Sequence, residues 1–288
     1  MAREDQSTPL DFGNFVVWGR AIGGVETCYQ VPAFDLNMDI GRCPDGAESQ
    51  RTLLLTHGHI DHAAGLPYFV SLRSMYGRPP PKIYCPAASR PALLAVLEAW
   101  DRLQTDALQC ELVGVEPGHR VPLGHGRTAL AVPAHHRIET VGWVVLEGHS
   151  RLRPDLKGHS EQDIRDRARA GEEVTVKDER PVLCYTGDTT IETLDDPTVR
   201  SCRILFIECT FFGSTVRRRG AKFGGHIHLN HLAERAEELK NEQLVLTHVS
   251  QRHDEKTILR ELQAKLPPSL LERTRVLAPT GQVLKPAY

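Results

Sequence analysis

The chain of 288 residues has little that would mark a disulfide-bonded protein, a cysteine-rich metal module or a membrane protein. Its seven cysteines are odd in number and form no Cys-x-x-Cys pair, which argues against a disulfide framework and against a cysteine-rich zinc module. No apolar run approaches the length of a membrane span, and Met1 to Gln6 lack an apolar signal region. We therefore expect reduced thiols, a cytoplasmic location and no membrane partner.

Net charge is also nearly absent, at a formal -2 at pH 7. There is no global basic field, so any binding of nucleic acid must depend on local patches. The hydrophobic fraction of 40% and the charged fraction of 25% are ordinary for a globular protein that buries a large core. The chain has no internal repeat, low-complexity segment or obvious linker, so we predict a single domain over residues 1–288.

Apolar runs typical of strands alternate with helical patterns along the chain. The strands that we expect are Phe15–Trp18, Thr27–Val31, Arg51–Thr56, Lys82–Cys85, Thr128–Val132, Val141–Leu146, Val182–Tyr185, Ile204–Ile207 and Gln243–Leu246. The expected helices are Asp61–Tyr76, Ser89–Leu103, about Ser160–Ala170 and Leu229–Leu239. This order favours an α/β fold in layers.

The most informative segment directly follows the expected strand Arg51–Thr56. It reads His57-Gly58-His59-Ile60-Asp61-His62 and places three imidazoles and a carboxylate within six residues. Imidazole suits zinc and its neighbours, and carboxylate oxygens complete such sites. A solvated histidine-rich turn is the alternative, but packing does not explain this density of ligand-type side chains. The segment therefore predicts a metal site at the end of a strand.

Four later strands end in the same way, with a ligand-type side chain after an apolar run. These side chains are His135-His136, Asp188, Glu208 and His248. Loop positions at strand ends are where a rigid scaffold holds functional groups. Each is weak alone, because a segment such as that around Asp188 also fits a plain turn. Together with the first motif they predict a site with two groups of metal ligands.

With these motifs the chain resembles the metallo-β-lactamase superfamily, whose pattern is His-x-His-x-Asp-His followed by His, Asp and His at later strand ends. Within it the chain is most similar to RNase Z, the endonuclease that trims 3′ trailers from precursor tRNA, in its short plant-type form. The matching segments are Ile22–Cys28, Asp39–Pro44, Thr186–Thr190, Glu208–Phe211, Gly225–His228 and Thr247–Arg252. The resemblance implies a four-layer αββα sandwich.

The resemblance also implies two divalent metal ions, for which Zn²⁺ is the best candidate and Mn²⁺ or Fe²⁺ are alternatives. One ion would have three histidine ligands, the other an aspartate and two histidines, and a second aspartate would bridge them. The ligands of the first ion would be His57, His59 and His136, those of the second Asp61, His62 and His248, and the bridging residue Asp188. His135 is the alternative to His136, and the Gly142-Trp143 step favours His136 because the family places its ligand six residues before such a step.

Relatives use a glutamate and a late histidine as a proton-donating pair. Glu208 matches the first, and His226 matches the second with His228 as the alternative. We read His231 as a helix-surface residue. The implied reaction is attack of a metal-activated hydroxide, oriented by Asp61, on a phosphodiester, while His226 protonates the leaving 3′-oxygen.

A basic segment lies between the two members of that pair. Its cations could contact phosphates of precursor tRNA, although a solvated loop explains such a run equally well; they are Arg217, Arg218, Arg219 and Lys222. Many bacterial relatives carry a long Gly/Pro-rich arm between the middle histidine and the bridging aspartate. The interval His149 to Arg180 is short and charged here, so we expect no such arm. The resemblance further implies a homodimer.

Two alternatives belong to other functional classes. A small-molecule hydrolase, such as a phosphodiesterase or lactonase, could use the same two metals. A non-catalytic RNA-binding or scaffold protein could keep the fold. The full ligand set argues against the scaffold protein. The pair of Glu208 and His226 argues against the small-molecule hydrolase, because an easy leaving group does not require a proton donor.

Overall fold

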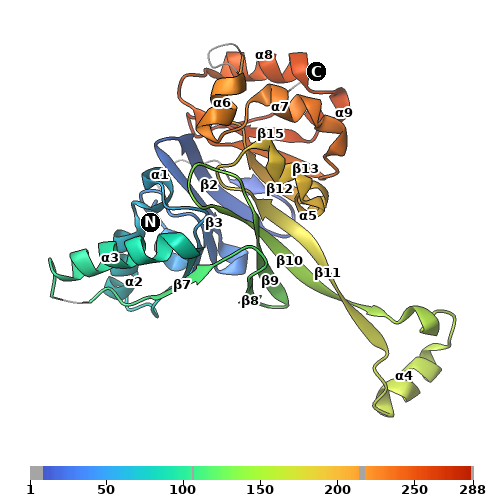
Figure 1. Ribbon diagram of the computed structural model, residues 1–288. Coiled ribbons are helices and arrows are strands. Elements are labelled where there is room, and N and C mark those ends of the chain that lie inside the picture. Colours follow the sequence, from blue (N-terminus) through green and yellow to red (C-terminus); the bar gives the residue numbers. More distant parts are fainter. Residues whose placement is uncertain (1–8, 106, 214–217, 287–288) are drawn as a thin grey trace.

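Two sheets that pack face to face form the centre of the protein. The computed structural model describes residues 9–105, 107–213 and 218–286, and in this part of the chain each sheet has eight strands. Helices cover the outer face of each sheet (Figure 1). The predicted four-layer αββα sandwich is therefore confirmed.

The first sheet runs in the order β1 to β7, with β14 paired to β2. Its strands are β1 (Leu10–Asp11), β2 (Val16–Gly23), β3 (Glu26–Val31), β4 (Leu36–Met38), β5 (Thr52–Leu54), β6 (Lys82–Pro86), β7 (Glu111–Val115) and β14 (Val249–Ser250). Strand β14 pairs in parallel with the end of β2 through Val249 and Ile22. This pairing joins a late segment of the chain to the first hairpin.

The second sheet has the order β16-β15-β13-β12-β11-β10-β9-β8. Its strands are β8 (Arg120–Gly124), β9 (Arg127–Pro133), β10 (Val141–Leu152), β11 (Thr175–Tyr185), β12 (Ile204–Glu208), β13 (Gln243–Thr247), β15 (Thr274–Leu277) and β16 (Val283–Leu284). The neighbours β11, β12 and β13 are parallel. Their carboxyl ends therefore meet at one edge of the sheet, which is where the sequence places its later ligand-type residues.

Side chains from both sheets fill the space between them. Trp143, Tyr185 and Phe206 of the second sheet are buried there against Tyr29 of the first. The ring of Tyr29 meets those of Tyr185 and Phe206 edge-on, at centroid distances of 4.9 and 5.2 Å. This shared apolar layer fixes the two sheets relative to each other, and with them the loops at the strand ends.

Helices close the two outer layers. The first sheet is covered by α1 (Ile60–Ala63), α2 (Leu66–Met75) and α3 (Arg90–Asp101), and the second by α5 (Pro197–Ser201), α7 (Leu229–Glu234), α8 (Glu255–Lys265) and α9 (Pro268–Leu271). A further helix, α6, is Arg218–Gly224, and short 3₁₀ turns are Pro32–Phe34, Ala47–Ser49, Ala87–Ser89, Pro154–Leu156, Ile191–Asp195 and Ala236–Glu238. Within the described residues, no helix has the length and apolar character that crossing a membrane requires.

The helix predicted over residues 61–76 is divided into α1 and α2. The break lies at Gly65, where a Cβ atom would stand 2.4 Å from the backbone nitrogen of Cys43. The backbone nitrogen of Gly65 donates to the backbone oxygen of Gly41 at 2.6 Å, whereas in a continuous helix it would donate to that of Asp61. Met75, the last residue of α2, is 66% exposed.

A projecting arm, residues 147–180, contradicts the prediction that this interval forms none (Figure 1). Strands β10 and β11 continue as an antiparallel ribbon from the pair Glu147–Arg180 to the pair Leu152–Thr175, and α4 (Glu161–Arg169) lies beyond it. The ribbon is about 20 Å long, at about 3.3 Å per residue. Both faces of the ribbon are exposed to solvent, so its residues are mostly polar. For that reason a search for apolar runs does not detect this part of the two strands.

Candidate metal centre

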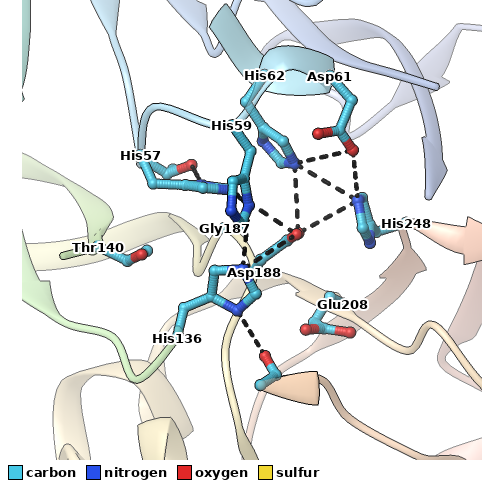
Figure 2. A network of polar contacts seen from close by, with 12 residues as sticks. His57, His59, Asp61, His62, His136, Thr140, Gly187, Asp188, Glu208 and His248 are labelled. Atoms are coloured by element: carbon cyan, nitrogen blue, oxygen red, sulfur yellow. Dashed lines mark hydrogen bonds and ion pairs between the residues drawn. The ribbon is translucent and has the colours of Figure 1, made fainter. Parts of the chain in front are cut away.

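Ligand-type side chains that follow strands of both sheets lie close together and point toward one another (Figure 2). His57 to His62 follow β5, and His136 follows β9. Asp188 follows β11 and His248 follows β13. His248 has a left-handed backbone, with φ of 55°, which turns its side chain back toward the site directly after the strand. All seven residues predicted as ligands lie together at this point.

The first group consists of His57, His59, His136 and Asp188, whose donor atoms all lie within 4.8 Å of one another. Nδ1 of His59 is 3.0 Å from Nε2 of His57 and 3.2 Å from Nε2 of His136. Oδ2 of Asp188 is 3.8 Å from Nε2 of His57. Three imidazole nitrogens and a carboxylate oxygen thus face a common point, as in a four-coordinate metal site.

The second group consists of Asp61, His62 and His248. Nε2 of His248 is 3.2 Å from Oδ2 of Asp61 and 3.4 Å from Nε2 of His62. Oδ1 of Asp188 lies 3.4 Å from Nε2 of both histidines. Asp188 therefore turns one oxygen to each group, which is the geometry of a bridging ligand.

The donor set fits two divalent cations. Asp188 is 2% exposed, and its Oδ1 has no hydrogen-bond partner within the described chain. A buried carboxylate oxygen without a partner is costly unless a cation faces it. Burial lowers the pKa of the His57 imidazole well below its ordinary value, which keeps that ring neutral and able to bind metal.

Two carboxylates, Asp39 and Asp188, flank His62 in the second group. Burial opposes a charge on His62, yet Asp188 and Asp39 together raise the pKa of His62 well above its ordinary range. His62 is fully buried between them, with Nδ1 at 2.7 Å from Oδ2 of Asp39. Tyr185 donates its hydroxyl to the same oxygen at 2.7 Å. Sequence analysis gave no role to Asp39 or Tyr185, although Asp39 also follows a short strand.

The structure selects His136 over His135. The His136 Nδ1 hydrogen-bonds to the backbone oxygen of Gly225 at 2.8 Å, which aims Nε2 at the first group. His135 is exposed, and its backbone nitrogen donates to Oγ1 of Thr189 at 2.9 Å. Adjacent residues at the end of a strand point in opposite directions, so only one of the two can reach the site.

Glu208 and His226 form a hydrogen-bonded pair beside the two groups. Nδ1 of His226 is 2.9 Å from Oε1 of Glu208 and 3.9 Å from Oδ2 of Asp188. Burial lowers the pKa of His226, but the charge and hydrogen bond of Glu208 outweigh it and raise that pKa to about 9. The ring of His226 lies nearly parallel to that of His248, with centroids 5.5 Å apart. A protonated imidazole is thereby held next to the ligand groups.

The alternative, His228, turns away from the site. Its Nε2 donates to the backbone oxygen of Gly213 at 2.8 Å, and its Nδ1 accepts from the backbone nitrogen of Asn230. His231 is 9% exposed, so the prediction of a helix-surface residue is wrong. Its Nδ1 accepts from the backbone nitrogen of His228 at 3.3 Å and caps the first turn of α7. This hydrogen bond turns the His231 side chain toward the N-terminal end of α7 and away from solvent.

The basic segment is largely helical where it is described. Arg217 lies outside the described residues, while Arg218, Arg219 and Lys222 belong to α6. The Lys222 ammonium forms an ion pair with Glu192 at 2.5 Å, so its charge already has a partner. Lys222 thus lies in a helix, where a loop was expected, and its contact with a phosphate stays a prediction.

Known proteins share this sequence pattern and fold. A family model described as "Beta-lactamase superfamily domain" matches residues 41–249. The tRNase Z TRZ1 of Arabidopsis thaliana is 32% identical over 276 residues, which cover 95% of this chain and 98% of that protein. The chloroplastic tRNase Z TRZ2 of the same plant is 31% identical over 263 residues, covering 89% of this chain and 73% of the relative.

Solved structures share the fold. The metallo-β-lactamase fold protein YhfI from Bacillus subtilis has a TM-score of 0.60 at 16% identity, covering 92% of this chain and 96% of its own. The short form of human tRNase Z has a TM-score of 0.52 at 19% identity, covering 95% and 92%. Together with the identity to the plant proteins over almost the whole chain, these findings show that the chain belongs to the tRNase Z family of the metallo-β-lactamase superfamily.

Proposed function

We propose that the protein is a metal-dependent endoribonuclease that removes 3′ trailers from precursor tRNA. The observation that carries this proposal is the buried Asp188, shared by two ligand groups, with the pair of Glu208 and His226 directly against it. Two ligand groups alone fit many hydrolases. A held proton donor is required when the leaving group is a poor one, such as a ribose 3′-oxygen.

We propose Zn²⁺ at both groups, with Mn²⁺ or Fe²⁺ as alternatives, because imidazole nitrogens dominate the donor set. When bound, two such ions lower the pKa of a water molecule and offset negative charge on a phosphodiester. Asp61 is fixed for a part in this chemistry, since its Oδ2 accepts a hydrogen bond from the backbone nitrogen of Gly24 at 2.9 Å. It orients the attacking water and accepts its proton.

His226 supplies the proton that the leaving group needs. Its Nδ1 is occupied by Glu208, so Nε2 is the atom that can donate to the ribose 3′-oxygen. Its side chain is 19% exposed, which leaves one edge of the ring open to a substrate. The products are a 3′-hydroxyl on the tRNA and a 5′-phosphate on the trailer.

Two further surfaces support a large substrate. The arm and α6 both lie on the chain between the candidate ligands, and we propose that the body of the precursor tRNA contacts them. Most arginines of the arm are paired, for example Arg153 with Asp155 at 2.6 Å and with Glu172 at 3.1 Å. We therefore expect the arm to add few counterion-releasing contacts and to act mainly through its shape.

We also propose a homodimer, in which the helices over the first sheet meet their copies. Several large apolar side chains are exposed on or beside these helices, among them Ile60, Tyr68, Trp100 and Leu103 at 78, 58, 50 and 75%. Tyr68 and Trp100 line one pocket there, and exposed apolar surface of this kind is typical of an association surface. Sedimentation at low salt tests it, and a monomer at micromolar concentration would contradict it.

The activity is tested with purified protein and a 3′-extended precursor tRNA, with added Zn²⁺ or Mn²⁺. We expect a metal-dependent cut just after the discriminator nucleotide and none with Asp61→Ala. A metal-loaded protein that leaves the precursor intact, but hydrolyses a simple phosphodiester or a lactone, would refute the proposal in favour of a small-molecule hydrolase.

A further inference from the structure

The hydroxyl of Thr210 lies between the proton-donating pair and the second ligand group. Oγ1 of Thr210 is 2.6 Å from Oε2 of Glu208 and 3.1 Å from Nδ1 of His248. Thr210, Glu208 and His248 are 5, 1 and 4% exposed, so water has little access to these contacts. Glu208 and His248 lie on the same side of Asp188, to the right in the view of Figure 2.

Chemistry fixes the hydrogen positions in this cluster. A hydroxyl has one hydrogen to donate, and a separation of 2.6 Å is typical of a hydroxyl that donates to a carboxylate. The hydrogen of Thr210 therefore points to Glu208, and its lone pair accepts from Nδ1 of His248. This places the ring hydrogen on Nδ1 and turns the lone pair of Nε2 toward Asp61 and Asp188.

The same arrangement recurs in the first ligand group. Oγ1 of Thr56 is 2.8 Å from Oδ2 of Asp39 and 3.0 Å from Nδ1 of His57. Thr56, Asp39 and His57 are all fully buried. In each group one threonine hydroxyl joins a histidine to a buried carboxylate. The repetition in two unrelated loops argues that the arrangement serves the ligands.

We propose that Thr210 is a positioning residue that sets the tautomer and direction of His248 and couples it to Glu208. Glu208 then holds two imidazoles at once, His226 directly and His248 through the Thr210 hydroxyl. Because one carboxylate holds both imidazoles, the proton donor His226 keeps a fixed position relative to the second ligand group. The inference rests on the proposed function only for the role of His226. The effect of Thr210 on the candidate metal ligand His248 does not depend on the substrate.

The test compares Thr210→Val with Thr210→Ser. Valine keeps the shape of threonine but leaves Nδ1–H of His248 without an acceptor, whereas serine keeps the hydroxyl. Replacing such orienting partners typically weakens metal binding about 10- to 100-fold. We expect a loss of that size for one of the two ions in Thr210→Val, measured by titrating Zn²⁺ against a chromogenic chelator, and near-normal binding in Thr210→Ser. The absorption spectrum of the Co²⁺-loaded protein should change in the valine variant alone.

Thr274→Val provides the matched control. Thr274 is 2% exposed, and its hydroxyl donates to the backbone oxygen of Leu270 at 2.7 Å. The variant therefore loses a buried hydrogen bond that is not part of the ligand groups. It should bind both ions as the wild type does. The inference is overturned if Thr210→Val also binds both ions normally, or if Thr210→Ser loses as much as valine. Because Zn²⁺ titration needs no RNA, failure of the tRNA activity would be seen separately.

Discussion

Replacing Glu208 by glutamine removes the charge that keeps His226 protonated while it preserves the shape of the side chain. The pKa of His226 is about 9, against an ordinary value of 6.5, although burial alone would lower it. That difference corresponds to about 3 kcal/mol in favour of the charged ring. In Glu208→Gln the two largest effects that raise the pKa are lost, while burial still lowers it and the charges of Asp188 and Asp61 still raise it, so the pKa of His226 should fall to about 6.5.

The loss of rate should therefore depend on pH. At pH 8, about nine-tenths of the wild-type protein carries the proton on His226, but only about 3% of the variant, so we expect cleavage about 30-fold slower. At pH 6 most of both proteins is protonated, and the deficit should shrink to about two-fold or less. The wild-type rate should fall only as the pH rises through about 9.

The assay is single-turnover cleavage of precursor tRNA between pH 5.5 and 9.5, with metal content checked at each end. Either oxygen of Glu208 accepts a backbone N–H, from Thr189 on one side and Ile227 on the other, so the amide of glutamine meets a donor whichever way it turns. That costs about 1–3 kcal/mol of stability, less than a domain normally has. His226→Ala, the control, should lose the alkaline fall altogether. An equal loss of rate at every pH would refute the reasoning.

Three further outcomes follow from the geometry of the ligand groups. Asp188→Ala should lower the content of both ions by elemental analysis, since one carboxylate faces both groups, and retention of two ions would contradict its bridging role. Gly225→Ala should weaken metal binding at the first group, because the new Cβ would stand 2.7 Å from Nδ1 of His136 at a residue with a φ of 77°. Gly213→Ala is the control: it adds similar backbone strain, at a φ of 64°, but its Cβ would meet no atom closer than 3.5 Å, so metal binding should be kept. Chelation should lower the melting temperature and added Zn²⁺ should restore it, since each ion at 1,000 times its Kd stabilises the fold by about 4 kcal/mol; an unchanged melting curve would argue against bound metal.

The convergence of the candidate metal ligands could be predicted because these residue types stand at strand ends. His57 to His62 are adjacent in the chain, and Asp188 and His248 each follow an apolar run. Parallel strands bring their carboxyl ends to one edge, so ligand-type residues at those ends meet without any further information. The choice of His136 depended on its spacing to Gly142, and the structure agrees with it.

Predictions failed where contacts between distant segments decide the outcome. The helix breaks at Gly65 because its backbone nitrogen bonds to Gly41, and His231 is buried because it caps the backbone nitrogen of His228. The arm has paired charges on a two-sided ribbon and so lacks the apolar period that marks a strand. A single domain over residues 1–288, a cytoplasmic location, Zn²⁺ and a homodimer stay predictions.

The sequence by itself determined the kinds of donor atom and the strand ends that carry them, because residue type and apolar period are properties of the chain. The tertiary structure alone decided how those donors are aimed. Oδ1 and Oδ2 of Asp188 face different groups, and Thr210 joins His248 to Glu208, only because packed sheets bring together residues far apart in the chain. Hydrogen-bond directions at this scale depend on tenths of an ångström, which close packing of the core fixes and residue order does not.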